Sequence, residues 1–97
     1  MYTSSTTLTT QEAPRLIKRL CTHWTHKFTV ETGISLGRID FGDSQYLLIG
    51  EDESIRVELH CPDEATTSRM QEVVFDHLQR MGKSGLPQPV WSTRHVE

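Results

Sequence analysis

The first third of the chain places apolar residues with the period of a helix. Apolar side chains recur three or four positions apart from Ala13 to Trp24, and basic residues fall mostly between them. At about 100° per residue these side chains form one stripe, which predicts an amphipathic helix over residues 10–26. Thr10 is the expected N-cap of this helix, and Pro14 lies early enough in it to be tolerated.

After residue 27 the period changes to two. Alternation of apolar and polar residues at 28–32, 36–41 and 55–60, together with a short apolar run at 46–49, predicts four strands. Turn residues separate these segments, so the connections are short and an antiparallel meander is expected. Because the run at 46–49 is apolar throughout, we expect that strand to lie inside the sheet.

A second helix is expected to begin at Pro62-Asp63-Glu64, where Asp63 can cap it and Glu64 lies at the positive end of its dipole. Its apolar positions extend from Met70 to Met81, and the glycines and prolines that follow should end it. Residues 89–92 are expected to add a short edge strand.

These elements predict an α+β fold. We expect a two-layer sandwich in which two helices cover one face of an antiparallel sheet of four or five strands, in the order α-β-β-β-β-α-β. A length of 97 residues suits a single domain, which we assign to residues 10–92. Residues 1–9 are rich in Ser and Thr and are expected to be a flexible lead-in, and residues 93–97 a polar tail.

Composition narrows the classes of function. Ten Lys and Arg against thirteen Asp and Glu give a net charge of -3, which disfavours a dedicated nucleic-acid binder. No apolar run approaches the roughly 18 residues of a membrane span and the N-terminus has no secretory signal, so we expect a cytoplasmic protein without a membrane partner. Cys21 and Cys61 are expected to be small, partly buried thiols.

Histidine placement is the least ordinary feature of the sequence. On the second helix His77 falls inside the apolar stripe, and on the first helix His23 lies at the edge of the stripe beside Trp24. If the two helices lie side by side on the sheet, His23 and His77 can meet across the seam. A buried imidazole needs partners for its ring nitrogens, so this pair is the main candidate for a site.

Three interpretations of the pair stay open. The first is structural, with His77 bonded to a backbone carbonyl or a polar side chain. The second is a Zn or Fe site in which His26 or Cys21 joins His23 and His77, because imidazole and thiolate suit these metals. The third is a small metal-dependent or histidine-based enzyme that uses His23 and His77, although no catalytic motif accompanies them.

The outward side of the predicted sheet carries mixed charge and no aromatic residues, unlike an RNA-recognition sheet. The strand at 46–49 must turn two apolar side chains to this side, where they form a candidate surface for a homodimer. Lys27 and Arg80 belong to basic positions on the two helices, which are expected to be solvated or to bind an anion or acidic partner.

Four segments of the sequence resemble a bacterial family, domain of unknown function 2218. They are residues 21–27 (Cys-Thr-His-Trp-Thr-His-Lys, the most specific block), 37–41, 77–80 and 89–91. The resemblance covers about residues 8–92, and the segment that starts at Met81 departs from the family pattern. The matching residues include His23, His26, His77 and Arg80. Family members are often associated with siderophore-interacting and iron-uptake genes, so the resemblance implies a link to iron handling.

Together these features predict a small non-catalytic accessory or binding protein, linked to iron or siderophore metabolism by the family resemblance. Its ligand should lie where the C-terminal end of the first helix meets the second, with Trp24, Lys27 and Arg80 as further candidate residues. The small enzyme is the alternative, and a plain dimerisation module is a third.

Overall fold

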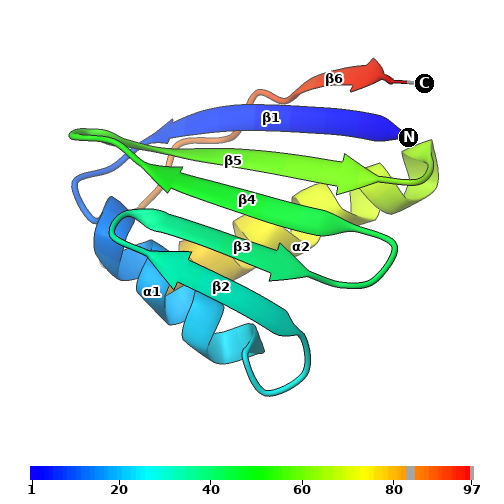
Figure 1. Ribbon diagram of the computed structural model, residues 1–97. Helices are drawn as coiled ribbons and strands as arrows, with labels where there is room; N and C mark the ends of the chain where they lie inside the picture. The colour runs from blue at the N-terminus through cyan, green and yellow to red at the C-terminus, as the bar shows by residue number, and fades with distance from the viewer. Residues whose placement is uncertain (83–84, 97) are drawn as a thin grey trace.

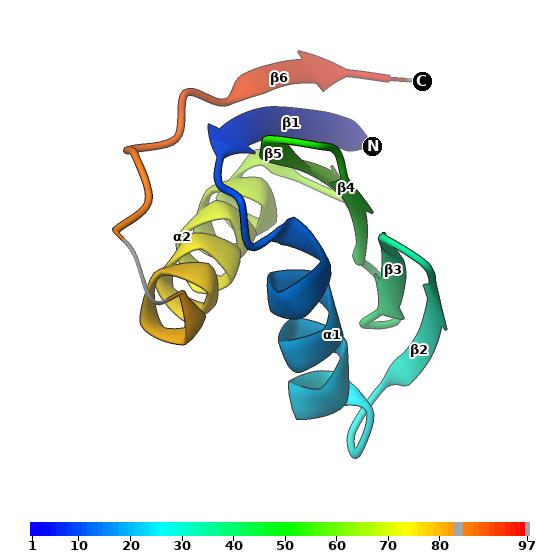
Figure 2. The same cartoon turned by 90° about the vertical axis from the view of Figure 1, so that its left-hand side faces the viewer.

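The computed structural model describes residues 1–82 and 85–96 of the chain. Six strands form one antiparallel sheet, and two helices lie together on one face of it (Figure 1). The strands are β1 (Tyr2–Thr9), β2 (Thr29–Gly33), β3 (Leu36–Asp40), β4 (Gln45–Gly50), β5 (Ser54–Cys61) and β6 (Ser92–His95), and the helices are α1 (Ala13–Trp24) and α2 (Glu64–Met81). The sheet is curved, and both helices lie on its concave side (Figure 2).

The α+β class, the antiparallel sheet and its two helices are confirmed. The strand order across the sheet is β2-β3-β4-β5-β1-β6, so the expected meander is present as β2 to β5. The predicted four or five strands and the order α-β-β-β-β-α-β are roughly consistent with the structure but lack one strand, because the sheet has six strands and the first element of the chain is β1 rather than a helix.

The expectation that residues 1–9 form a flexible lead-in is therefore corrected. Tyr2–Thr9 form β1, which pairs with β5 on one side and with β6 on the other. Ser4 is fully buried in this strand; its Oγ lies 2.8 Å from Thr93 Oγ1 and accepts a hydrogen bond of 2.8 Å from Gln71 Nε2 of α2. Since its buried hydroxyl has partners, a polar Ser/Thr segment can occupy the inside of a sheet.

The C-terminal assignment is corrected in the same way. Ser92–His95 form the edge strand β6, where residues 93–97 are expected to be a tail, and residues 89–91 precede the strand without regular structure. The backbone N–H of Val96 donates to the carbonyl of Met1 at 2.8 Å, so the two ends of the chain lie together, as Figure 1 shows. Glu97 lies outside the described residues.

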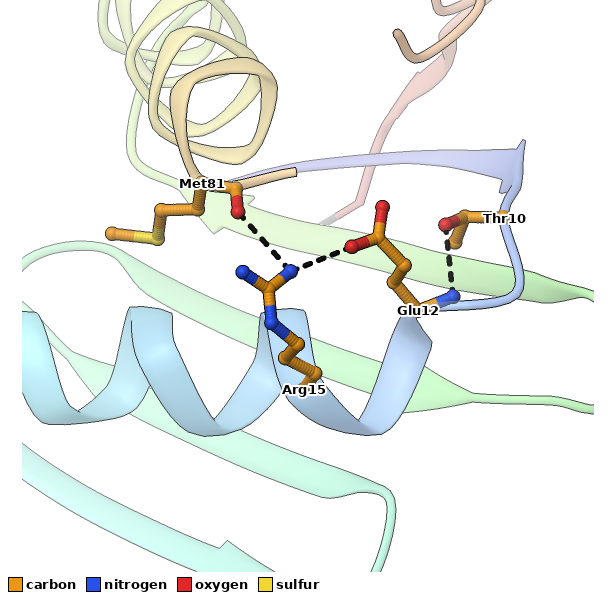
Figure 3. A network of polar contacts seen from close by, with 4 residues as sticks. All are labelled: Thr10, Glu12, Arg15 and Met81. Carbon is orange, nitrogen blue, oxygen red and sulfur yellow. Dashed lines mark hydrogen bonds and ion pairs between the residues drawn. The ribbon is translucent and has the colours of Figure 1, made fainter. Parts of the chain in front are cut away.

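α1 is shorter than predicted at both ends. Its N-cap residue is Glu12 rather than Thr10, whose hydroxyl instead accepts a hydrogen bond from the backbone N–H of Glu12 at 3.1 Å. Arg15 Nη1 donates to Glu12 Oε1 at 2.6 Å and to the Met81 carbonyl in the last turn of α2 at 3.4 Å (Figure 3). This network ties the start of α1 to the end of α2 and gives a partner to a carbonyl that the helix itself leaves unpaired.

α2 begins as the sequence predicts. Asp63 is its N-cap, and the carboxylate accepts a hydrogen bond of 2.7 Å from the backbone N–H of Thr66. The helix ends at Met81, directly before Gly82. Of the residues expected to end it, 83 and 84 lie outside the described part of the chain. Neither α1 nor α2 is long and apolar enough to cross a membrane.

The core lies between the sheet and the helices. The whole predicted stripe of α1 is buried, and the helix packs on β2, β3 and β4, whereas α2 packs on β5. Cys21 and Cys61 are both buried free thiols, as expected. Trp24, the last residue of α1, is only 7% exposed and ends the core where α1 meets α2.

Candidate functional site

The histidine pair that the sequence indicates is present at the contact between the helices. The ring centroids of His23 and His77 lie 5.0 Å apart, with their planes inclined by 53°. His23 is exposed at the C-terminal end of α1, and His77 is half-buried on α2. The pair therefore lies at the surface, with one ring open to solvent and the other set against the core.

Trp24 lies beneath this pair and connects it to the sheet. Its ring centroid is 4.8 Å from that of His77, 5.2 Å from Phe41 and 5.5 Å from Tyr46, and the last two contacts are edge-on. Edge-to-face packing at such distances stabilises aromatic clusters beyond their buried area. We call Trp24, Phe41, Tyr46, His23 and His77 the aromatic–imidazole cluster.

Tyr46 also attaches α2 to the sheet. Its hydroxyl donates to the Met70 carbonyl at 2.9 Å, and burial raises the pKa of the phenol well above its ordinary value. The phenol therefore stays neutral and keeps its proton for this bond. Since α2 carries His77, the bond helps to fix the height of His77 above Trp24.

The hydrogen bond of His77 determines which of its nitrogens is available. Nδ1 lies 2.7 Å from the carbonyl oxygen of Val73, one turn earlier in α2. A carbonyl can only accept, so Nδ1 carries the proton and the neutral ring has its lone pair on Nε2. In residues 1–82 and 85–96 nothing bonds to Nε2. The backbone carbonyl partner agrees with the structural interpretation, but the second nitrogen is left free to bind a ligand.

Cys21 does not join the pair. It lies against β3, where a Cβ built on Gly37 would come within 2.6 Å of the Cys21 sulfur. Burial also raises the pKa of this thiol, which disfavours the thiolate form that metals bind. Over the described parts of the chain, no three His, Cys, Asp or Glu side chains are grouped so that they could hold a metal ion.

The remaining candidates lie around the cluster without joining it. His26 and Lys27 are exposed in the turn after α1, where the backbone N–H of Lys27 donates to the Trp24 carbonyl at 3.1 Å. Arg80 is exposed and pairs with Asp76, one turn earlier in α2, at 3.0 Å. Arg80 is thus engaged within its own helix, while His26 and Lys27 border the cluster on the side of α1.

A groove of about 570 Å³ lies elsewhere, between α1 and the β2–β3 hairpin. Its lining includes Ile17, Lys18 and Cys21 from α1 and Val30 and Ile34 from the hairpin. Neither His23 nor His77 lines it. The imidazole pair therefore lies outside this groove.

Sequence reasoning did not assign Phe41, Tyr46 or the Val73 carbonyl to the site. The four-residue spacing of Val73 and His77 on a predicted helix could have indicated the hydrogen bond between them. Phe41 and Tyr46 come from β3–β4, and only the crossing of α1 over the sheet places their rings against Trp24.

The fold and the cluster define a small α+β domain with an imidazole pair where its two helices meet. The chain belongs to the bacterial family described as "Uncharacterized protein conserved in bacteria" (DUF2218), whose model matches residues 5–92. The resemblance in the sequence is thereby confirmed.

One solved structure shows how the fold recurs. PA4090 from Pseudomonas aeruginosa, solved by NMR, is 42% identical in sequence to this chain, and the two structures superpose with a TM-score of 0.82. The match covers 95% of this chain and 96% of the PA4090 chain. No curated protein matches the sequence.

Proposed function

We propose that this chain is a non-catalytic binding protein of the bacterial cytoplasm, whose ligand binds the imidazole pair His23 and His77. The observation that carries the proposal is the hydrogen bond from Nδ1–H of His77 to the Val73 carbonyl, because it leaves the lone pair of Nε2 free to coordinate a metal. His23 is exposed beside it, at a ring distance of 5.0 Å.

This geometry supports a transition-metal ligand. With metal–nitrogen bonds of about 2.1 Å, two imidazoles on one ion have ring centroids about 5 Å apart. Two protein donors are fewer than the three or four of a resident catalytic or structural metal, and the described chain offers no third. A metal bound here would therefore bring its other ligands with it, as a complex with a small chelator.

The family resemblance indicates iron as the first metal to test. The resemblance implies an association with siderophore-interacting and iron-uptake genes, and a chelated ion is the form in which two donors suffice. Binding is favoured over catalysis because the groove of about 570 Å³, which could enclose a substrate, is lined by neither imidazole.

Titration of the full chain, purified without a histidine tag, tests the proposal. The probes are ferric and nickel nitrilotriacetate, chelates that leave about two positions open for imidazole, with isothermal calorimetry and NMR of the histidine rings as readouts. We expect heat and selective perturbation of His23 and His77, both lost in His23→Gln and in His77→Gln. His60→Gln, which changes a histidine bonded to Glu58 on the opposite face, should bind like the unaltered protein. Absence of binding, or binding that survives both cluster variants, would falsify the proposal.

A further inference from the structure

The convex face of the sheet is covered by neither helix, as the two views show (Figures 1 and 2). On β4, Tyr46 and Leu48 are buried toward the helices, so the residues between and beside them point to the convex face. Leu47 and Ile49 are the two apolar side chains that the sequence predicts on this side. Both remain partly exposed.

A third apolar side chain extends this surface. Leu36 of β3 is the direct cross-strand neighbour of Ile49 and is 44% exposed. Neighbouring strands lie about 4.8 Å apart, so Leu36, Leu47 and Ile49 form one continuous apolar cluster over β3 and β4. We call these three residues the convex apolar cluster.

Charged residues flank the cluster in an ordered way. The strand register places Leu47 between Arg38 of β3 and Glu58 of β5. One row further along, it places Gln45 between Asp40 of β3 and His60 of β5. In both rows an anionic group lies opposite a basic one across β4, and the signs are reversed from one row to the next.

Arg38 differs from Glu58 in that it forms no ion pair. Glu58 has His60 Nε2 at 3.1 Å and Arg56 Nε at 3.8 Å, whereas Arg38 makes no ion pair with any residue of 1–82 or 85–96. Arg38 is exposed beside the apolar cluster, and its cross-strand neighbour on β2 is Glu31, with which it forms no ion pair in the described chain.

We propose that the convex face is the interface with a second copy of this chain, related by a two-fold axis that runs parallel to β4. Such an axis places Leu47 and Ile49 against the same residues of the other copy and brings β3 over the partner's β5. Arg38 then faces the partner's Glu58, and Asp40 faces the partner's His60. Because the interface is symmetric, the contact between the opposite charges of Arg38 and Glu58 occurs twice.

A second copy of this chain fits the convex face better than a nucleic acid does. The convex face alternates Arg38 and Arg56 with Glu31, Asp40 and Glu58, whereas a phosphate backbone requires a surface of uniform positive charge. Sheets that pack face to face also align their strands to within about 30°, which an axis parallel to β4 permits.

The same geometry limits the strength of the dimer. Because both faces are convex (Figure 2), two copies can touch only along β3, β4 and β5. With three apolar side chains per copy, we expect the contact to bury less than the about 800 Å² per partner of a standard stable interface. We therefore expect a dissociation constant in the micromolar range or weaker, and a dimer that weakens as salt rises.

Sedimentation equilibrium from low micromolar to millimolar protein tests the proposal. We expect a monomer–dimer equilibrium, weakened about tenfold or more by Arg38→Glu and likewise by Glu58→Arg, because each places like charges together. The double variant R38E/E58R exchanges the two charges across the interface and should restore dimerisation to within about threefold of the unaltered protein. Arg19→Glu on the exposed side of α1 is the matched control and should leave the equilibrium unchanged.

Thermal unfolding shows whether each variant is folded, and Leu47→Gln gives an independent disruption of the interface without a change of charge. A protein that stays monomeric at millimolar concentration overturns the proposal. This holds even if a different protein is later found to bind the convex face. A dimer that the two single charge reversals leave intact overturns the proposal as well. The imidazole pair lies on the other side of the sheet, so neither result bears on the proposed ligand site.

Discussion

His77 packs on Trp24 with ring centroids 4.8 Å apart, so the half-buried imidazole of the candidate site shares a surface with the last buried residue of α1. The site is therefore not a loop appended to the fold. The indole that supports His77 also contacts Phe41 and Tyr46, so a change at Trp24 affects stability and the position of His77 together.

Replacement of this indole should be costly. Trp24→Ala removes a side chain that is only 7% exposed and opens a cavity among three rings, so we expect the free energy of unfolding to fall by about 3–5 kcal/mol. Urea denaturation followed by circular dichroism measures the loss. Lys27→Ala, an exposed position three residues later, is the control and should change stability by less than about 0.5 kcal/mol. A loss as small for Trp24→Ala would contradict the burial of the ring.

Gly37 sets how closely α1 approaches β3. A methyl group at this position would lie 2.6 Å from Cys21 Sγ and 3.0 Å from Ile17 Cγ2, so Gly37→Ala should destabilise the protein by about 1–3 kcal/mol through overpacking. Combining it with Cys21→Ala removes the closer of the two clashes, and the double variant should lose less than the sum of the single changes.

Denaturant unfolding of the four proteins gives this coupling directly. Gly33→Ala is the matched control, because its added methyl group would meet only Leu36 Cβ, at an ordinary 3.7 Å. If the losses of unfolding free energy for Gly37→Ala and Cys21→Ala are additive, the clash is relieved by a movement of α1 as a whole and not by a movement of the Cys21 side chain.

Arg15 joins the start of α1 to the end of α2. Arg15→Ala removes its hydrogen bonds to Glu12 and to the Met81 carbonyl and should lower the free energy of unfolding by about 1 kcal/mol. Hydrogen exchange of the last turn of α2 should rise in parallel, because the Met81 carbonyl loses a partner from outside its helix. Arg19→Ala, on an exposed position of the same helix, should leave both measurements unchanged.

The cap of α2 predicts a dependence on acid. Hydrogen bonds from Thr66 hold the pKa of Asp63 below its ordinary 3.8, so folding favours the ionised carboxylate. The stabilisation is thus complete above pH 3.8, where the carboxylate is ionised in both states, and is lost as the pH falls through the lower folded-state pKa.

Melting temperatures measured from neutral to strongly acidic pH check this cap. Asp63→Ala should melt below the unaltered protein at neutral pH, and the difference should shrink as the pH falls below 3.8. Asp63→Asn keeps a capping oxygen without a titrating charge, so at neutral pH it should melt between Asp63→Ala and the unaltered protein. A difference for Asp63→Ala that is the same at every pH would show that the carboxylate charge plays no part.

The period of the apolar residues predicted the type of element correctly wherever one face of that element is apolar. The alternation from Ile55 to Leu59 predicts β5, and the stripe from Ala13 to Trp24 predicts α1, because burial of one face selects a period of two or 3.6. It failed for β1, whose inward residues include Ser4 and Thr6. Their burial becomes tolerable only when β5, β6 and α2 supply pairing and hydrogen bonds, and those partners are remote in the sequence.

The sequence by itself determined the two helices, the central meander and the presence of His77 on a largely apolar helix face, since these follow from local spacing. Only the tertiary structure decided which side chains meet. It paired His77 with His23, turned Cys21 toward Gly37 and away from both histidines, and aligned Arg38, Leu47 and Glu58 in one row. Helix crossing and strand register set these contacts, and both depend on the packing of the whole core rather than on any one segment.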